Sequence, residues 1–191
     1  MAVMNNQSYR EWCRGIKDSD RSAYEEVFRE MHDKLYRYAF SITTDRSSAL
    51  DLVQETFLDL WEKRASLDPE RSLKALLFRM VRNKAYNHQR NHRRREEILQ
   101  NNPSRLPMGQ PVLPDGMVSA NHLDEKLQKW IGRLPNRQRE ALVLSRYEGM
   151  NHNEIAEVME ISPRTVNNHL VRALKTLRDQ IRSYEPGLLG S

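Results

Sequence analysis

The sequence predicts an all-α protein made of two small helical domains joined by a flexible linker. Apolar residues recur at the three- and four-residue spacing of amphipathic helices, and no long stretch alternates with a period of two. Between residues 101 and 118, four prolines and two glycines exclude a continuous helix. We therefore expect an N-terminal domain at residues 8–99, a linker at 100–118 and a C-terminal domain at 119–185 that contains a helix-turn-helix.

The composition favours a cytoplasmic protein that binds a polyanion. The 191 residues carry a net charge of +5, and the isoelectric point is near 9.4. Cys13 is the only cysteine, which excludes an internal disulfide and suits a reducing compartment. No stretch of the sequence reaches the roughly 20 apolar residues of a membrane span, so we expect no membrane insertion.

The first informative helix is predicted at residues 48–63. Its inward stripe consists of Ala49, Leu52, Val53, Thr56, Phe57 and Leu60. Leu58 lies at the centre of the other, acidic face, with Leu50 and Trp61 at its edge. An apolar spot with a polar rim is typical of a protein-binding surface, although a single exposed leucine on a solvated face is the alternative. The residues of this face are Asp51, Gln54, Glu55, Leu58 and Glu62.

The next helix, predicted at residues 72–95, has a basic outer face. Between residues 79 and 97, seven basic residues stand against two acidic ones. Arginines neutralise phosphates and Tyr86 or Phe78 can stack on an unpaired base, so the helix favours partly single-stranded DNA over a merely solvated face. We expect Leu73, Leu76, Leu77, Met80 and Val81 to point inward. We expect Arg79, Arg82, Tyr86, Arg90 and Arg93 to point outward, with Asn83 at their flank.

A helix-turn-helix is predicted at residues 155–170. Ser162 can cap the second helix, and Pro163 suits its first position, where no hydrogen-bond donor is lost. We expect the inward stripe to be Val166, Leu170, Ala173, Leu174 and Leu177. The other side carries Arg164, Thr165, Asn168, Arg172 and Lys175, which are side chains that read bases or hold phosphates in a major groove. An ordinary amphipathic helix with a solvated face is the alternative.

Three blocks in this order resemble the bacterial extracytoplasmic-function (ECF) sigma factors. They are Asp-Leu-Val-Gln-Glu-Thr-Phe-Leu-Asp-Leu-Trp at residues 51–61, Leu-Leu-Phe-Arg-Met-Val-Arg-Asn-Lys-Ala at 76–85, and Leu-Pro-Asn-Arg-Gln-Arg-Glu at 134–140. The resemblance covers almost the whole chain. It implies a subunit that binds core RNA polymerase, reads the promoter −10 and −35 elements and assists promoter melting.

The resemblance also implies roles for individual residues. The family docks on the clamp coiled coil of the largest polymerase subunit through an Asp-x-x-Gln-Glu-x-x-Leu face, which corresponds to Asp51, Gln54, Glu55 and Leu58, with Glu62 beside them. The family reads the −10 element with the loop before the basic helix, here residues 67–73, and with an Asn near the middle of that helix, here Asn83. Together with the basic stripe described above, the residues expected at the −10 element are Leu67, Arg71, Leu73, Arg79, Arg82, Asn83, Tyr86, Arg90 and Arg93. The −35 element is read by Arg164, Thr165, Asn167, Asn168, Arg172 and Lys175.

Further partners follow from the same resemblance. They are the flap of the second-largest polymerase subunit, promoter DNA and an anti-sigma factor, with a free chain that is monomeric. The chain departs from the family at Leu76, where many members have tryptophan, and at Glu160, where many have glycine in the helix-turn-helix turn. We expect Glu160 to adopt the required backbone conformation with some strain.

Two other functions are compatible with parts of the sequence. A stand-alone helix-turn-helix regulator explains the C-terminal domain but leaves the residue 51–61 face and the basic helix without a role. A small nuclease would use His32, Asp33, His88 and His92. His88 and His92 are four residues apart on a helix, but no third ligand follows at a supporting spacing, so we predict no metal site, no cofactor and no enzymatic activity.

Overall fold

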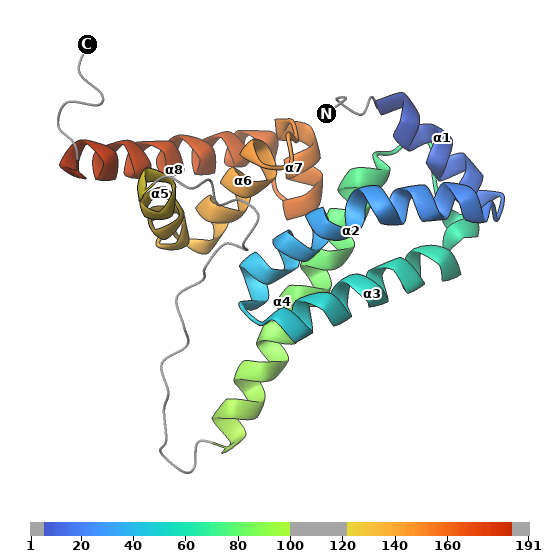
Figure 1. Ribbon diagram of the computed structural model, residues 1–191, viewed down its shortest axis with the longest axis horizontal. Helices are drawn as coiled ribbons and strands as arrows, with labels where there is room; N and C mark the ends of the chain where they lie inside the picture. The colour runs from blue at the N-terminus through green and yellow to red at the C-terminus, as the bar shows by residue number, and fades with distance from the viewer. Residues whose placement is uncertain (1–5, 100–121, 185–191) are drawn as a thin grey trace. The chain divides into compact units, whose positions relative to one another are not determined.

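The computed structural model describes residues 6–99 and 122–184, which form two separate helical units (Figure 1). All regular elements within these ranges are helices, which confirms the predicted all-α fold. Residues 100–121 stand between the units, so the predicted linker at 100–118 lies outside the described residues. None of the described helices is long and apolar enough to cross a bilayer.

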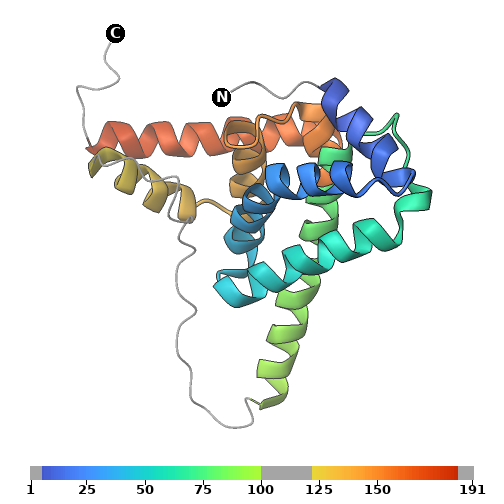
Figure 2. The same cartoon turned by 45° about the vertical axis from the view of Figure 1, so that its right-hand side comes forward.

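The N-terminal unit is a bundle of four α-helices and one short 3-10 helix. The elements are α1 (Asn6–Lys17), α2 (Arg21–Thr43), α3 (Arg46–Glu62), η1 (Arg64–Ser66) and α4 (Leu73–Leu99). Helix α2 packs against α1, α3 and α4, and α4 also packs against α1 and α3. Tyr38, Phe57 and Phe78 are the largest side chains fully enclosed in the core between them. Figure 2 shows α1 beside the segment that joins η1 to α4.

Capping residues set the start of the two helices that lead to this core. Asp20 accepts a hydrogen bond from the backbone N–H of Ser22, at 2.8 Å, and Asp45 accepts one from the N–H of Ser48, at 2.7 Å. Hydrogen bonds from the side chain and then the backbone N–H of Ser22 hold the pKa of Asp20 below its ordinary value, and Ser48 lowers the pKa of Asp45 in the same way. Thr44, with φ of 59°, turns the chain between α2 and α3. The observed α3 therefore begins two residues before the predicted helix.

The packing of α4 corrects part of the sequence-based prediction. Phe78 is fully buried and its ring lies 5.2 Å from that of Tyr38, so it cannot stack on a base. Arg82 is only 5% exposed, although the periodicity placed it on the outer face. Leu76 and Met80 are half-buried instead of fully inward. These differences arise because three helices pack around α4 and cover more than one of its sides.

The C-terminal unit consists of α5 (His122–Gly132), α6 (Asn136–Arg146), α7 (His152–Met159) and α8 (Pro163–Tyr184). Helix α8 packs against α5, α6 and α7, and its buried residues are Val166, Leu170, Ala173 and Leu177. Leu174 is 37% exposed, so the prediction that it points inward was wrong. The remaining members of the predicted inward stripe are confirmed.

The corner between α7 and α8 has the expected helix-turn-helix chemistry. Ser162 Oγ accepts a hydrogen bond from the N–H of Thr165, at 3.1 Å, and Pro163 is the first residue of α8. Glu160 ends α7 in the left-handed conformation, with φ of 56° and ψ of 46°, as expected from its place in the turn. The start of α7 has a capping box that the sequence analysis missed, in which Asn151 and Glu154 bond each other's backbone.

Candidate protein and nucleic-acid interfaces

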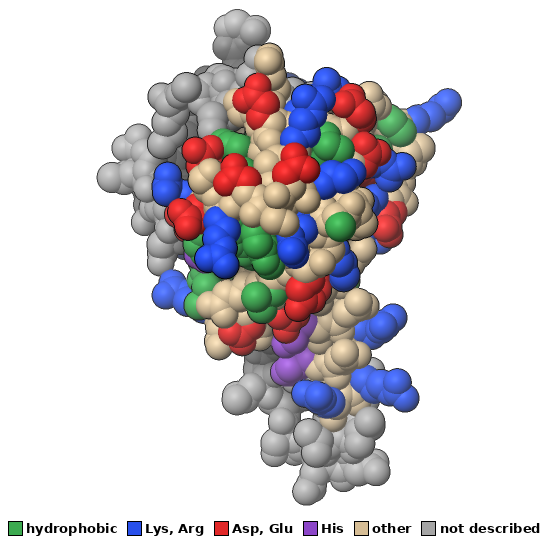
Figure 3. Space-filling view, turned by 90° about the vertical axis from the view of Figure 1, so that its right-hand side faces the viewer, with side chains coloured by type: hydrophobic (Ala, Val, Ile, Leu, Met, Phe, Trp, Pro, Cys, Tyr) green, Lys and Arg blue, Asp and Glu red, His purple; other side chains and the backbone are tan. Residues whose placement is uncertain are grey.

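Helix α3 presents one buried and one exposed side. Its buried residues are those predicted, from Ala49 to Leu60. Asp51, Gln54, Glu55, Leu58 and Glu62 are all exposed. Leu58 is 62% exposed and Leu50 38%, so the apolar spot within the acidic face is present. Figure 3 shows how apolar, acidic and basic side chains alternate over one side of the molecule. The geometry is that of a polar-rimmed protein-binding surface, and its binding role stays a prediction.

A row of aromatic residues extends from α3 onto α2. Tyr24 Oη donates a hydrogen bond to the carbonyl of Phe57, at 3.1 Å, and its ring lies 5.2 Å from that of Trp61. The Phe28 ring lies 4.7 Å from that of Phe57 and 5.0 Å from that of His32. This row was not predicted from the sequence, although Tyr24, Phe28 and His32 follow one another at intervals of four residues.

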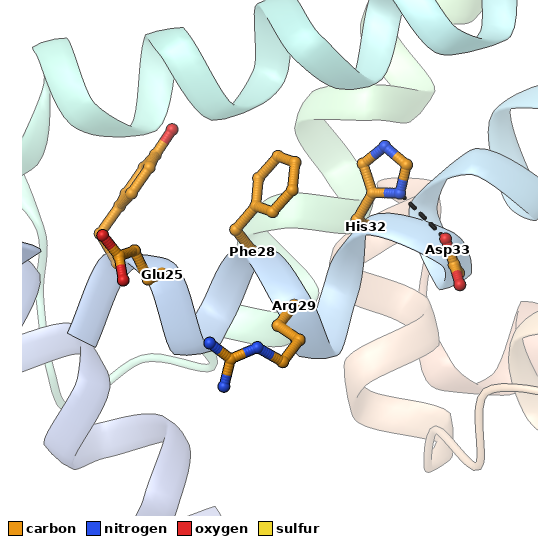
Figure 4. A pocket seen from close by; sticks show the side chains of 6 residues that line it. Glu25, Phe28, Arg29, His32 and Asp33 are labelled. Carbon is orange, nitrogen blue, oxygen red and sulfur yellow. Dashed lines mark hydrogen bonds and ion pairs between the residues drawn. The ribbon is translucent and has the colours of Figure 1, made fainter. Parts of the chain in front are cut away.

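The exposed side of this row forms a shallow hollow of about 510 Å³ (Figure 4). His32 Nδ1 lies 2.9 Å from the carboxylate of Asp33. These two residues of the nuclease alternative therefore contact each other. The lining residues are Tyr24, Glu25, Phe28, Arg29, His32 and Asp33.

An ionic cluster joins α4 to α3. Lys84 Nζ lies 3.2 Å from the carboxylate of Glu55 and 2.9 Å from that of Asp59. The hydrogen bond from Lys84 holds the pKa of Asp59 below its ordinary value, although burial opposes the shift. Burial lowers the pKa of Lys84, but the bonds to Asp59 and Glu55 outweigh it and leave that pKa raised. Lys84 was expected only as part of the basic helix, but its contact with Glu55 neutralises part of the acidic face.

The outer face of α4 retains some of the predicted DNA-contacting residues. Asn83 and Arg90 are exposed, and Arg79 and Tyr86 are half-buried. The guanidinium of Arg82 lies 4.9 Å from the centre of the Tyr86 ring and is buried, so Arg82 does not lie on the outer face where the periodicity placed it. The side chain of Arg93 lies outside what the structure describes. Figure 3 shows Lys, Arg and His side chains on the part of α4 that projects from the unit.

The loop before α4 also requires a correction. Leu67 is 5% exposed and Leu73 only 2%, so the inward position predicted for Leu73 is confirmed and neither side chain is accessible at the surface. Both side chains instead anchor the two ends of the loop in the core. Arg71 is exposed, with its Nε 3.6 Å from the carboxylate of Asp68. Within this loop, Arg71 is the predicted residue that remains accessible.

Helix α8 presents its predicted polar face to solvent. Thr165 is half-buried, with its Oγ1 2.8 Å from Ser162 Oγ, which fixes it within the first turn. No Asp or Glu occurs between residues 163 and 178 of this helix, so its polar side carries only basic and uncharged side chains. The exposed predicted residues are Arg164, Asn167, Asn168, Arg172 and Lys175.

The geometry offers little to a metal ion. Within residues 6–99 and 122–184, no three His, Cys, Asp or Glu side chains come together in a way that could hold one. The rings of His88 and His92 are 6.4 Å apart between centroids.

Comparisons of the sequence with known proteins all identify sigma factors as its relatives. Residues 27–95 match the family described as sigma-70 region 2, and residues 124–177 match sigma-70 region 4. The ECF RNA polymerase sigma factor SigL of Mycobacterium tuberculosis is 30% identical over 158 residues, covering 80% of this chain and 87% of SigL. The ECF sigma factor SigE of Mycolicibacterium smegmatis is 28% identical over 85% of this chain, which spans only 63% of SigE.

A solved structure shares the fold. RpoE of Bartonella quintana, crystallised with the anti-sigma factor NepR, superposes with a TM-score of 0.67 at 24% identity. The match covers 83% of this chain and 96% of that structure.

Proposed function

The chain belongs to the ECF RNA polymerase sigma factors, which direct promoter-specific transcription initiation, and we propose that it binds core RNA polymerase through α3. The binding surface consists of the exposed face defined above, with Leu58 at its centre. Its partner is a helical surface of the largest polymerase subunit that carries basic and apolar side chains. The residues that make the contact are Asp51, Gln54, Glu55, Leu58 and Glu62.

One observation carries this assignment, namely the exposure of Leu58. The opposite side of α3 buries six residues in the bundle, so Leu58 contributes nothing to the core of its own unit. A 62% exposed leucine surrounded by carboxylates and amides gains stability only when a partner covers it. The neighbouring Leu50 enlarges the apolar area that a partner would cover.

The two DNA elements are assigned to different units. We assign the −35 element to α8, through Arg164, Asn167, Asn168, Arg172 and Lys175, with Thr165 at the edge of this surface. We assign the −10 element to α4 and the loop before it, through Arg71, Arg79, Asn83, Tyr86, Arg90 and Arg93. Arg82, Leu67 and Leu73 are removed from this set because they are buried, and act by holding the others in place.

Further partners complete the proposal. RpoE of Bartonella quintana binds the anti-sigma factor NepR, and we propose an anti-sigma partner for this chain as well. We also propose that the C-terminal unit contacts the flap of the second-largest polymerase subunit. The free protein is a cytoplasmic monomer that acquires its partners in turn.

The direct test is Leu58→Asp, with binding to purified core polymerase measured by fluorescence anisotropy. A charge at the centre of the interface should weaken binding by roughly 30-fold, as expected when an anchor residue is lost. Ala65→Asp, which adds the same charge at an exposed position of η1, is the control and should bind normally. Both variants should keep the helical circular dichroism of the parent protein.

Two results would contradict the proposed function. Unchanged affinity of Leu58→Asp for core polymerase would remove α3 as the docking surface. Tight, sequence-specific binding of the free chain to duplex promoter DNA at physiological salt would favour a stand-alone helix-turn-helix regulator instead.

A further inference from the structure

Helix α1 has a basic stripe that faces the loop at residues 67–72. Arg10, Arg14 and Lys17 follow at intervals of four and three residues, so they lie along one side of the helix. An adjacent side, formed by Tyr9, Cys13 and Ile16, is buried in the bundle and fixes α1 in place. The stripe is therefore carried by a rigid element.

Each member of the stripe contacts the loop. Lys17 Nζ donates a hydrogen bond to the carbonyl oxygen of Leu67, at 2.8 Å. The carboxylate of Glu70 lies 3.5 Å from Arg14 Nη2 and 3.7 Å from Arg10 Nη2. Helix α1 thus holds both the start of the loop and its tip.

The loop itself is compact. The Asp68 side chain accepts a hydrogen bond from the N–H of Glu70, at 3.0 Å, and the Asp68 carbonyl accepts one from the N–H of Arg71, also at 3.0 Å. Leu67 and Leu73 are buried at its two ends. The direction of the exposed Arg71 side chain therefore depends on how this turn is held.

The three contacts do not have equal weight. The Glu70 ion pairs are solvent-exposed, with 67% of the Glu70 side chain accessible, and pairs of this kind contribute little. The Lys17 bond is short, partly buried and made by a charged donor to a backbone acceptor, which places it in the stronger class. Lys17 is thus the principal contact between α1 and the loop.

We infer that Lys17 is a positioning residue for the −10 element: its bond to the Leu67 carbonyl holds the loop at residues 67–72 in the conformation that sets base preference. The inference rests on the proposed role of this loop in reading the −10 element. Lys17 does not touch DNA in this scheme. It acts through Leu67 and the turn at Asp68, and the Arg10 and Arg14 pairs with Glu70 assist it.

The test compares Lys17→Met, which keeps the aliphatic chain and removes the ammonium, with Lys17→Arg, which keeps a donor. Arg29→Met, which removes an exposed positive charge from α2, is the control for net charge. The first readout is amide hydrogen exchange of the free, full-length protein. The amides of Glu70 and Arg71 should exchange about tenfold faster in Lys17→Met, less so in Lys17→Arg, and normally in Arg29→Met.

The second readout is transcription in vitro with core polymerase on promoters randomised at the −10 element and separately at the −35 element. Lys17→Met should reduce discrimination among −10 bases by about three- to tenfold and leave −35 preference unchanged. Lys17→Arg should restore most of the discrimination. Unchanged amide exchange, or an equal loss on all −10 sequences, would overturn the inference.

Arg71→Ala separates failure of this inference from failure of the proposed function. If Arg71→Ala alters −10 preference and Lys17→Met does not, the loop reads DNA but Lys17 does not position it. If Arg71→Ala leaves −10 preference intact, the loop does not read the −10 element, and the inference fails together with that assignment.

Discussion

Helices α4 and α8 are both long, basic and amphipathic, and both are assigned to DNA, but they occupy different positions in their units. Helix α8 buries a single stripe, from Val166 to Leu177, and leaves its polar side free. Helix α4 lies among α1, α2 and α3, and in its first half it buries side chains on more than one side. A helix with neighbours on several sides has less surface to offer a ligand than its sequence indicates.

This difference in packing decides whether an arginine on either helix is accessible to DNA. On α8, Arg164 and Arg172 are exposed and available to DNA. On α4, Arg82 is enclosed and stacks on Tyr86, so its charge is part of the folded unit. Residues of the same type at similar helical positions therefore differ in function because of the packing around them.

The largest effect that tests this comparison is expected from Arg82→Ala. Removing a buried, stacked guanidinium should lower the free energy of unfolding of the N-terminal unit by about 3 kcal/mol. Chemical denaturation followed by circular dichroism measures this value. Arg90→Ala, at an exposed position of the same helix, should change stability by less than about 0.5 kcal/mol.

Equal stability of these two variants would contradict the distinction between buried and exposed arginines on α4. Arg90→Ala should instead weaken promoter binding for all sequences alike and lower the salt slope by about one, because it removes a phosphate contact.

An intermediate effect is expected when an exposed residue of each helix is changed. Arg164→Ala on α8 should cost about 1–3 kcal/mol and relax preference at one or two −35 positions, since a base contact is lost. Asn83→Ala on α4 should do the same at −10 positions. Transcription from promoters varied at one element at a time distinguishes the two.

The assignment of the units to the two elements depends on this outcome. Losses of Asn83→Ala that follow the −35 bases, or losses of Arg164→Ala that follow the −10 bases, would reverse it.

The smallest effect concerns the corner that starts α8. Glu160 has a positive φ, which strains a residue with a Cβ, so Glu160→Gly should stabilise the C-terminal unit by about 0.5–1 kcal/mol. Glu160→Ala keeps the strain and should give no gain. Thermal denaturation of both variants measures the difference, and equal melting temperatures would indicate that the corner stores no strain.

Periodicity predicted the parts of this molecule where a helix has one buried side. It placed the exposed Leu58 face of α3 and nearly all of α8 correctly, because a single stripe of apolar residues defines the orientation of such helices. It misplaced Leu174, which lies at the edge of its stripe.

The same reasoning failed where tertiary packing decides. Arg82 and Phe78 are buried because other helices cover the sides of α4 that carry them, which no count along one helix can detect. Leu67 and Leu73 were assigned to DNA by family resemblance, which locates a loop but not the direction of its side chains. The contact between Lys17 and Leu67 spans 50 residues and left no local signal.

The ionic cluster around Lys84 has a consequence for how the two proposed ligands affect each other. Lys84 is a shared counterion: it neutralises Glu55 and Asp59 on the docking side while belonging to the helix assigned to DNA. If a basic group of the polymerase pairs with Glu55 in place of Lys84, the positive charge of Lys84 is less compensated. Helix α4 then attracts phosphate more strongly. By thermodynamic reciprocity, DNA on α4 must then strengthen the hold of polymerase on α3 by the same factor.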